Sequence, residues 1–106
     1  MKNKFLQFLG LTKQAGNLKE GYNKCEEALK FGQAKLIIMS MDASTNTKDK
    51  FNTYCDRYNT TIINSFSKEE LGSALGRLEI NVVCVTEARM SKRLLELWNE
   101  EKINRG

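Results

Sequence analysis

The stretch that decides the fold is Lys35-Leu36-Ile37-Ile38-Met39-Ser40-Met41, a short apolar run between polar neighbours. A run of this length without polar alternation predicts a strand that is covered on both faces. Val82-Val83-Cys84-Val85 has the same character and predicts a second buried strand. The β-branched stretch Thr61-Ile62-Ile63-Asn64 and an extended piece around Leu18-Lys19 complete the set. We therefore expect about four strands.

Amphipathic segments lie between these strands. Apolar residues at helical spacing predict a first helix over roughly residues 3–15 and a third over roughly residues 46–58. The second helix opens at Gly21 and stops at Gly32, both residues that tolerate special backbone angles at helix ends. Its buried stripe is expected to consist of Tyr22, Cys25, Ala28 and Leu29.

The best specified boundary is the start of a fourth helix at Ser67. Ser67 and Glu70 can satisfy each other's backbone donors in a capping box, and Gly76 lies where this helix should end. A last helix follows the strand at Val82-Val85. Its buried side is expected to carry Met90, Leu94, Leu97 and Trp98.

The alternation of strands and helices sets the fold class. Short connections between alternating strands and helices imply right-handed crossovers and parallel strands. We therefore expect an α/β fold: a three-layer α/β/α sandwich with a mostly parallel central sheet of about four strands. A chain of 106 residues fits one core, so residues 1–106 are expected to form a single domain.

Composition narrows the class of protein. The chain is 41% apolar and 28% charged, which is ordinary globular usage and argues against a disordered or fibrous protein. The basic start Met1-Lys2-Asn3-Lys4-Phe5 is followed by an interrupted apolar stretch, unlike a signal peptide. No apolar run approaches the ~20 residues that cross a bilayer. The net charge of +4 favours an anionic partner. We expect a soluble cytoplasmic protein with no membrane partner.

The sequence offers little for catalysis or metal binding. It has no histidine, no Gly-x-Ser-x-Gly elbow and no Walker-type loop. Its adjacent glutamate pairs fall on predicted helices, where neighbouring side chains diverge. Cys25, Cys55 and Cys84 form no Cys-x-x-Cys pair, and we interpret them as small buried residues in a reducing compartment. We expect no enzymatic activity, no metal and no cofactor.

The clearest candidate site is the stretch Asn17-Leu18-Lys19-Glu20-Gly21-Tyr22-Asn23-Lys24, where a turn, a lysine and a glycine precede a helix. A helix start has unpaired N–H groups and the positive end of the helix dipole, and both attract anions. Gly21 lets a phosphodiester backbone approach without a side chain in the way, and Asn23 can read bases. The alternative, that Gly21 and Asn23 only shape and cap the helix, stays open here.

Five stretches together resemble a known family. They are Gly10–Gly16, Glu20-Gly21, Ala34–Ile38, Asp42–Thr47 and Ser67–Gly76. Over nearly its whole length the chain is similar to the ribosomal-protein L-seven-Ae superfamily of kink-turn RNA binders, and within it to the short bacterial YlxQ-type members. The resemblance implies an α/β/α sandwich. It also implies a non-enzymatic, ribosomal or ribosome-associated protein that recognises kinked or internally looped RNA, such as ribosomal RNA.

The resemblance also implies which residues of the second helix contact RNA. In the family that helix begins with a Gly-x-Asn-Glu pattern, and Gly21-Tyr22-Asn23 matches its first part. Asn23 thereby inherits a base-reading role against sheared G·A pairs. Lys24 stands where the glutamate is expected, and Glu27 stands where a lysine is expected. This exchange of charge alters which base edges can be bonded.

The family's second contact is the loop before the last strand, which here is Arg77-Leu78-Glu79-Ile80-Asn81. Leu78 and Ile80 can support an unstacked base, and Arg77 can reach phosphate, whereas Glu79 works against an anion. A plain helix-to-strand turn remains the alternative for so short a loop. The implied fold also brings three lysines to the end that carries Arg77, as a basic rim: Lys13, Lys19 and Lys24.

A second class of function stays open. The same fold can serve as a protein-protein adaptor, and the exchanged charges at Lys24 and Glu27 can mean that RNA affinity has weakened in favour of a partner surface. We expect a monomer that binds structured RNA, with the adaptor as the alternative.

Overall fold

The computed structural model describes residues 3–104, which form five helices and four strands. The helices are α1 (Lys4–Gln14), α2 (Tyr22–Lys30), α3 (Thr45–Arg57), α4 (Lys68–Ala74) and α5 (Ala88–Asn104). The strands are β1 (Leu18–Glu20), β2 (Leu36–Met39), β3 (Thr61–Asn64) and β4 (Val82–Val85). Every strand and helix expected from the sequence is present, so the α/β expectation is confirmed.

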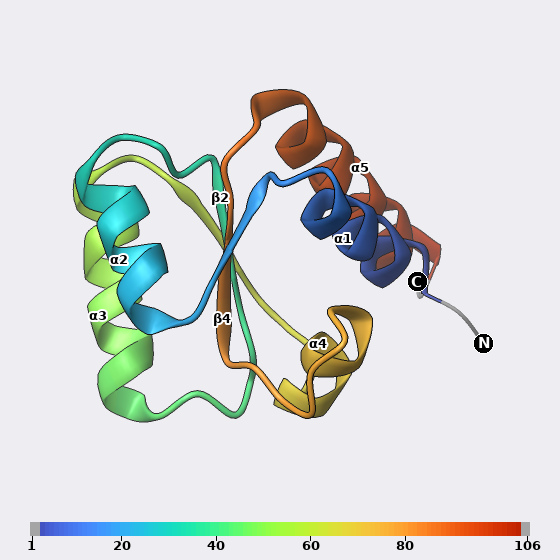
Figure 1. Ribbon diagram of the computed structural model, residues 1–106, viewed down its shortest axis with the longest axis horizontal. Coiled ribbons are helices and arrows are strands. Elements are labelled where there is room, and N and C mark those ends of the chain that lie inside the picture. Colours follow the sequence, from blue (N-terminus) through green and yellow to red (C-terminus); the bar gives the residue numbers. More distant parts are fainter. Residues whose placement is uncertain (1–2, 105–106) are drawn as a thin grey trace.

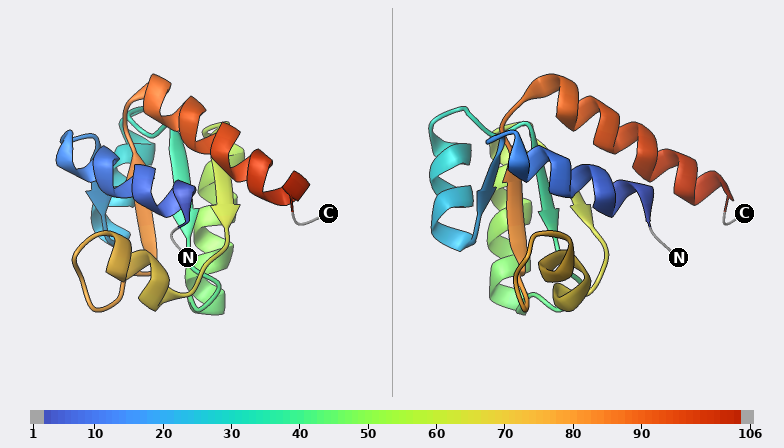
Figure 2. Two further views of the ribbon diagram at one scale, coloured as in Figure 1. Left: turned by 90° about the vertical axis from the view of Figure 1, so that its right-hand side faces the viewer. Right: turned by 45° about the vertical axis from the view of Figure 1, so that its right-hand side comes forward.

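The sheet separates two helical layers (Figure 1). α2 and α3 cover one face, and α1, α4 and α5 lie on the other, where α1 and α5 run side by side (Figure 2). Leu36 and Ile38 of β2 are buried in the core against α1, α4 and α5. Ile37 and Met39 are buried in the core against α2 and α3. β2 is therefore covered on both faces, which is why its sequence is continuously apolar.

The expectation of a mostly parallel sheet is wrong, because the sheet is mixed. Its order is β1-β4-β2-β3; β2 and β3 are parallel, and β4 is antiparallel to both of its neighbours. The cause is α4, a helix of seven residues. Such a helix is only about 10 Å long. α4 lies at the end of the sheet where β3 finishes (Figure 1). The chain therefore starts β4 from that same end and runs back between β1 and β2.

The capping box at the start of α4 is confirmed. Ser67 Oγ accepts a hydrogen bond from the backbone N–H of Glu70 at 3.0 Å, and the Glu70 carboxylate accepts one from the backbone N–H of Ser67 at 2.8 Å. Gly76, just beyond the helix, has a φ of 73°. No helix within residues 3–104 is long and apolar enough to cross a membrane.

The cysteines are buried and unbridged, as their spacing indicated. Burial raises the pKa of the Cys55 thiol to about 11 and that of Cys84 to about 12, and it also raises the pKa of Cys25. These thiols therefore stay protonated near neutral pH and pack as small apolar groups.

Candidate nucleic-acid interface

The start of α2 is fixed to the sheet by its backbone. Gly21 has φ 96° and ψ 164°, a combination that is essentially restricted to glycine. Its N–H donates to the carbonyl of Val82 at 3.0 Å, which joins the helix start to the first residue of β4. No side chain within residues 3–104 caps this helix. The N–H groups of the first turn therefore have no side-chain partner and can donate hydrogen bonds to an anion.

The side chains of this first turn divide into two kinds. Asn23, Lys24 and Glu27 are exposed. Tyr22 is half-buried, and its ring stands edge-on to that of Phe51 with 5.1 Å between the ring centroids. Tyr22 therefore anchors the start of α2 to α3, whereas Asn23 and Lys24 are accessible to a ligand.

The loop 77–81 is held close to α4. The backbone N–H of Arg77 donates to the carbonyl of Gly72 at 2.8 Å, and that of Ile80 donates to Lys68 at 3.0 Å. A Cβ atom on Gly72 would lie only 2.6 Å from the Cα atom of Glu79. Gly72 is therefore required for the loop to approach the helix, a role that the sequence analysis missed.

The two apolar side chains of this loop lie in different environments. Leu78 is 95% exposed, whereas Ile80 is half-buried and packs against the core on the α1, α4 and α5 side. A leucine this exposed contributes almost nothing to the fold. Leu78 therefore offers an apolar surface to a ligand, and Ile80 acts mainly as the anchor of the loop.

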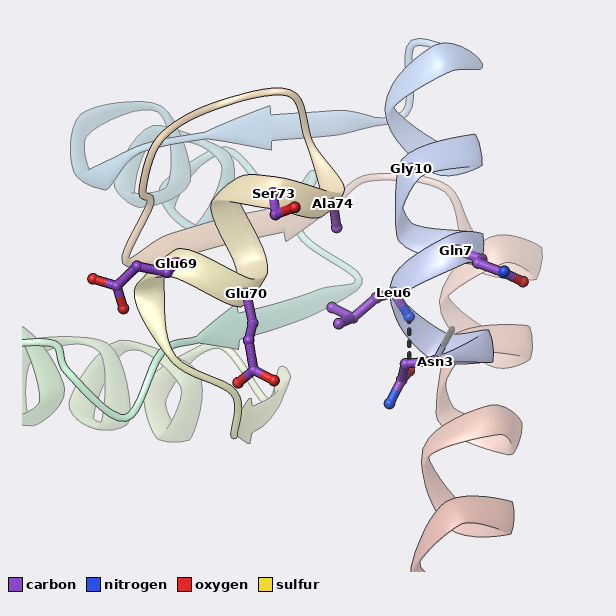
Figure 3. A pocket seen from close by; sticks show the side chains of 8 residues that line it. All are labelled: Asn3, Leu6, Gln7, Gly10, Glu69, Glu70, Ser73 and Ala74. Atoms are coloured by element: carbon purple, nitrogen blue, oxygen red, sulfur yellow. Dashed lines mark hydrogen bonds between the residues drawn. The ribbon is translucent and has the colours of Figure 1, made fainter. Parts of the chain in front are cut away.

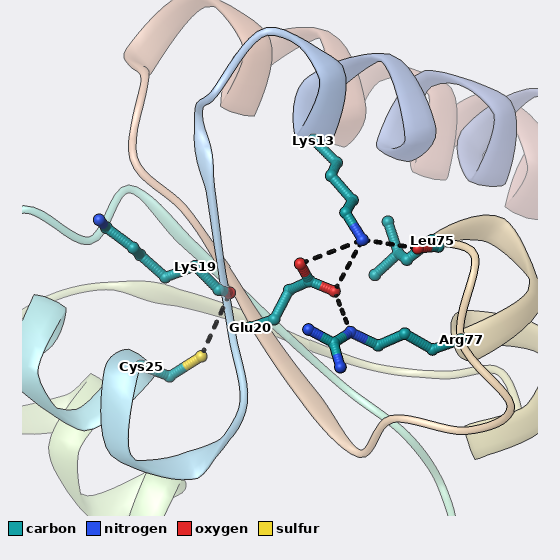
Figure 4. A network of polar contacts seen from close by, with 6 residues as sticks. All are labelled: Lys13, Lys19, Glu20, Cys25, Leu75 and Arg77. Carbon is teal, nitrogen blue, oxygen red and sulfur yellow. Dashed lines mark hydrogen bonds and ion pairs between the residues drawn. The ribbon is translucent and has the colours of Figure 1, made fainter.

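An ion cluster links this loop to the start of α2 (Figure 4). Arg77 Nε donates to Glu20 Oε1 at 2.6 Å, and Lys13 Nζ lies 3.3 Å from Glu20 Oε2. Lys13 also donates to the carbonyl of Leu75 at 2.7 Å. Two of the four expected rim cations thus converge on one carboxylate that directly precedes Gly21. Lys19 extends from the other side of β1 (Figure 4), and within residues 3–104 neither Lys19 nor Lys24 forms an ion pair.

Glu20 is the residue of this end that sequence reasoning undervalued. Its side chain is only 13% exposed. Burial alone would raise the pKa of Glu20, but the hydrogen bonds and charges of Arg77 and Lys13 outweigh burial and lower it below its usual value. A signal was present, because strand alternation places Glu20 on the face of β1 opposite Lys19. A half-buried carboxylate on that face requires a cationic partner.

A hollow of about 560 Å³ lies between α1 and α4 (Figure 3). Two of its lining side chains, Glu69 and Glu70, are carboxylates, and Glu70 also belongs to the capping box. Negative charges at its wall repel phosphate. This hollow therefore does not extend the candidate interface.

Comparison with known proteins assigns the chain to a family. The profile of the Ribosomal protein L7Ae/L30e/S12e/Gadd45 family matches residues 3–95. The chain belongs to this family. Among its relatives is the RNA-binding protein YlxQ of Bacillus subtilis (strain 168), 29% identical over 89 residues that cover 84% of this chain and 89% of the relative. The RNA-binding protein YlxQ of Enterococcus faecium is 28% identical over 97 residues, which cover 90% of this chain and 94% of the relative.

Solved structures agree with the L7Ae/L30e/S12e/Gadd45 assignment. A Bacillus halodurans protein of unknown function superimposes with a TM-score of 0.88 at 33% identity, over 91% of this chain and 97% of that one. The 15.5kD RNA-binding protein of Giardia lamblia superimposes with a TM-score of 0.73 at 19% identity, over 87% of this chain and 85% of that one. The second likeness shows the shared fold alone.

Proposed function

We propose that this chain is a non-enzymatic RNA-binding protein that uses the start of α2 and the loop 77–81 as one continuous interface. The observation that carries the proposal is the link between the two segments. Gly21 is bonded to Val82, and Arg77 is bonded to Glu20, the residue before Gly21. Exposed Asn23 and Leu78 therefore belong to the same end of the molecule.

Each part of this interface has a physical role. The free N–H groups of the first turn of α2, together with Lys24, attract phosphate, and Gly21 leaves room for the RNA backbone. The amide of Asn23 can donate to and accept from base edges. Leu78 offers an apolar surface to an unstacked base. Bent or looped RNA presents both a close pair of phosphates and an unstacked base, so it suits this arrangement.

The names of the relatives support an RNA ligand. Both YlxQ proteins are named RNA-binding proteins, and the family carries a ribosomal protein in its name. Within this proposal we assign the chain kink-turn-like RNA as its ligand and a ribosomal or ribosome-associated role. The exchanged charges at Lys24 and Glu27, both exposed, are where its recognition is expected to differ from the family pattern.

The direct test is a filter-binding titration with a kink-turn hairpin and with a control hairpin whose G·A pairs are replaced by Watson–Crick pairs. We expect tighter binding of the kink-turn. Asn23→Ala should erode this discrimination, whereas Lys19→Ala, at an exposed lysine of the basic rim, should weaken both complexes alike and lower the salt slope by about one. Lys50→Ala, an exposed lysine of α3, is the matched control. Equal affinity for the two hairpins would reject kink-turn recognition, and no binding to either would reject the RNA ligand.

The exchanged charges allow a second test. The double variant Lys24→Glu with Glu27→Lys restores the charge order of the family at two exposed positions, so the fold should tolerate it. If these side chains meet the G·A pairs, discrimination between the two hairpins should change. Unchanged discrimination would show that neither side chain contacts those pairs. A protein that purifies without 260 nm absorbance, ignores both hairpins and co-purifies with a protein partner would favour the adaptor function instead.

A further inference from the structure

A second hollow lies at the opposite end of the sheet. β1 and β2 both run antiparallel to β4, so they run in the same direction. The end of β1, next to Gly21, and the start of β2 at Leu36 therefore lie at opposite ends of the sheet. Figure 1 shows the connections α2–β2 and α3–β3 side by side at the end where β2 starts. Between them is a hollow of about 370 Å³. It is lined by Leu29, Gly32, Ala34, Lys35, Tyr58, Asn59, Thr60 and Thr61.

Two aromatic rings are exposed at this end. Phe31, at the end of α2, is 72% exposed, and Tyr58, at the end of α3, is 37% exposed and lines the hollow. Within residues 3–104, five large apolar side chains are exposed, and these two are the aromatic ones. A phenylalanine this exposed is not explained by the core. Exposed aromatic faces are the surfaces on which unpaired bases stack.

The charge in the lining of the hollow favours an anion at its rim. Among the residues that line the hollow, Lys35 is a cation and none is a carboxylate. The last turns of α2 and α3 carry Lys30 and Arg57, and they also carry the acids Glu27 and Asp56. Within the described part of the chain, Lys35 and Arg57 form no ion pair, and Lys30 reaches Glu26 only at 3.9 Å. The hollow of Figure 3, with two glutamates in its wall, has the opposite character.

The polar groups of the hollow suit a base better than a phosphate. The carbonyl ends of α2 and α3 point toward this edge and disfavour an anion deep inside it. Carbonyls of both last turns already accept backbone hydrogen bonds from the residues that follow each helix. The side chains of Asn59, Thr60 and Thr61 are the groups that can bond the polar edge of a base. A volume of about 370 Å³ falls within the range of roughly 300–1,000 Å³ that small-ligand sites occupy.

We propose that this far end is a second RNA contact that takes one unpaired nucleotide. Its base enters the hollow against Tyr58. The exposed ring of Phe31, next to the lining residue Gly32, supports the base at the entrance, and a flanking phosphate meets Lys35. Adenine, whose larger ring stacks more strongly, is preferred over uracil. This contact is separate from the interface at the start of α2 and does not depend on kink-turn recognition.

The test uses fluorescence anisotropy with the full chain and two labelled ten-nucleotide probes, oligoadenylate and oligouridylate. Oligoadenylate should bind more tightly. Phe31→Ala should weaken it by about tenfold through the lost stacking, and Lys35→Ala should lower the salt slope by about 0.7, the value for one phosphate contact on a single strand. Leu11→Ala, a 53% exposed leucine of α1, and Lys50→Ala are the matched controls and should behave as wild type. Because all four side chains are exposed, each variant should fold, which a circular dichroism spectrum checks.

Three outcomes would overturn the proposal. One is the absence of saturable oligonucleotide binding. Another is a loss of binding with Asn23→Ala while Phe31→Ala behaves as wild type, which would place the probe at the start of α2. The third is a response of Phe31→Ala only to a protein partner and not to RNA.

Failure here can be told apart from failure of the proposed function. A kink-turn hairpin with no tail tests the α2 interface alone. The same hairpin with a ten-nucleotide tail can reach the far end, because ten nucleotides at about 3.4 Å each match the 35 Å length of the molecule. If the tail tightens binding in wild type but not in Phe31→Ala, the far contact is supported. Two results would count against it. In one, the tail does not change the affinity of the wild-type protein; in the other, the tail tightens binding equally in wild type and in Phe31→Ala.

Discussion

Replacing Glu20 by glutamine removes a carboxylate while keeping the shape of the side chain, and it tests how the two segments of the candidate interface are held together. Glu20 is 13% exposed, but Lys13 and Arg77 are 39% and 51% exposed, so water screens both pairs. Screened ion pairs are worth roughly 0.2–1 kcal/mol each. We therefore expect Glu20→Gln to lower the free energy of unfolding by about 1–2 kcal/mol in total, because both ion pairs are removed and the short hydrogen bond from Arg77 is left with a neutral acceptor.

The assay is thermal unfolding at two pH values. A loss of 1 kcal/mol lowers the Tm of a domain this size by about 4 °C, so the Tm at pH 7 should fall by about 4–8 °C. Because the pKa of folded Glu20 is lowered, its stabilisation is present above its unfolded pKa and is lost as the pH falls through the folded pKa. The difference between wild type and variant should therefore shrink in acid.

A matched control separates this cluster from ordinary surface charge. Glu96→Gln removes a 50% exposed carboxylate that pairs with Arg93 at 3.3 Å on α5, and it should change the Tm only slightly. Equal Tm values for Glu20→Gln and wild type at pH 7, or a difference that persists undiminished at low pH, would refute the reasoning.

Three further predictions concern the backbone and the thiols. Gly21→Ala should destabilise the fold by about 1–3 kcal/mol in urea titrations, because alanine is strained at φ 96°. The added Cβ meets no neighbouring group within 4 Å, so the loss comes from backbone strain and not from a clash, and an unchanged midpoint would contradict this. Gly72→Ala should cost about 1–3 kcal/mol and shift the amide resonances of the loop at Glu79, because its Cβ would overlap that backbone; unshifted resonances would count against the assigned packing. Cys25 and Cys84 should resist a thiol reagent at pH 8 in the folded protein and react after denaturation, because burial raises their pKa values; rapid labelling of the native state would disprove their assigned burial.

Most of the fold follows from local sequence patterns. The continuous apolar run of β2 and the capping box at Ser67 are local features, and both appear where the sequence places them. The direction of β4 is not local. It depends on the end of the sheet at which the chain emerges from the seven-residue helix α4. A pattern of alternating strands and helices does not contain that information.

The candidate site shows the same division. The exposure of Asn23 and Lys24 follows from their place in the first turn of an amphipathic helix. Lys13 and Arg77 both contact Glu20. Arg77 is 57 positions from Glu20 in the sequence, so only the tertiary fold brings these side chains together. Periodicity marks which face a residue occupies, but it does not name the partner on that face.

The most direct test of the RNA-binding interface is an amide chemical-shift titration of the labelled protein with a kink-turn hairpin. We predict that the largest shifts fall on Tyr22, Asn23 and Lys24 and on the loop at Arg77 and Leu78, in a saturable manner. Shifts confined to other surfaces, or none at all at protein concentrations that saturate a known RNA binder, would contradict the assignment of this end of the molecule to RNA.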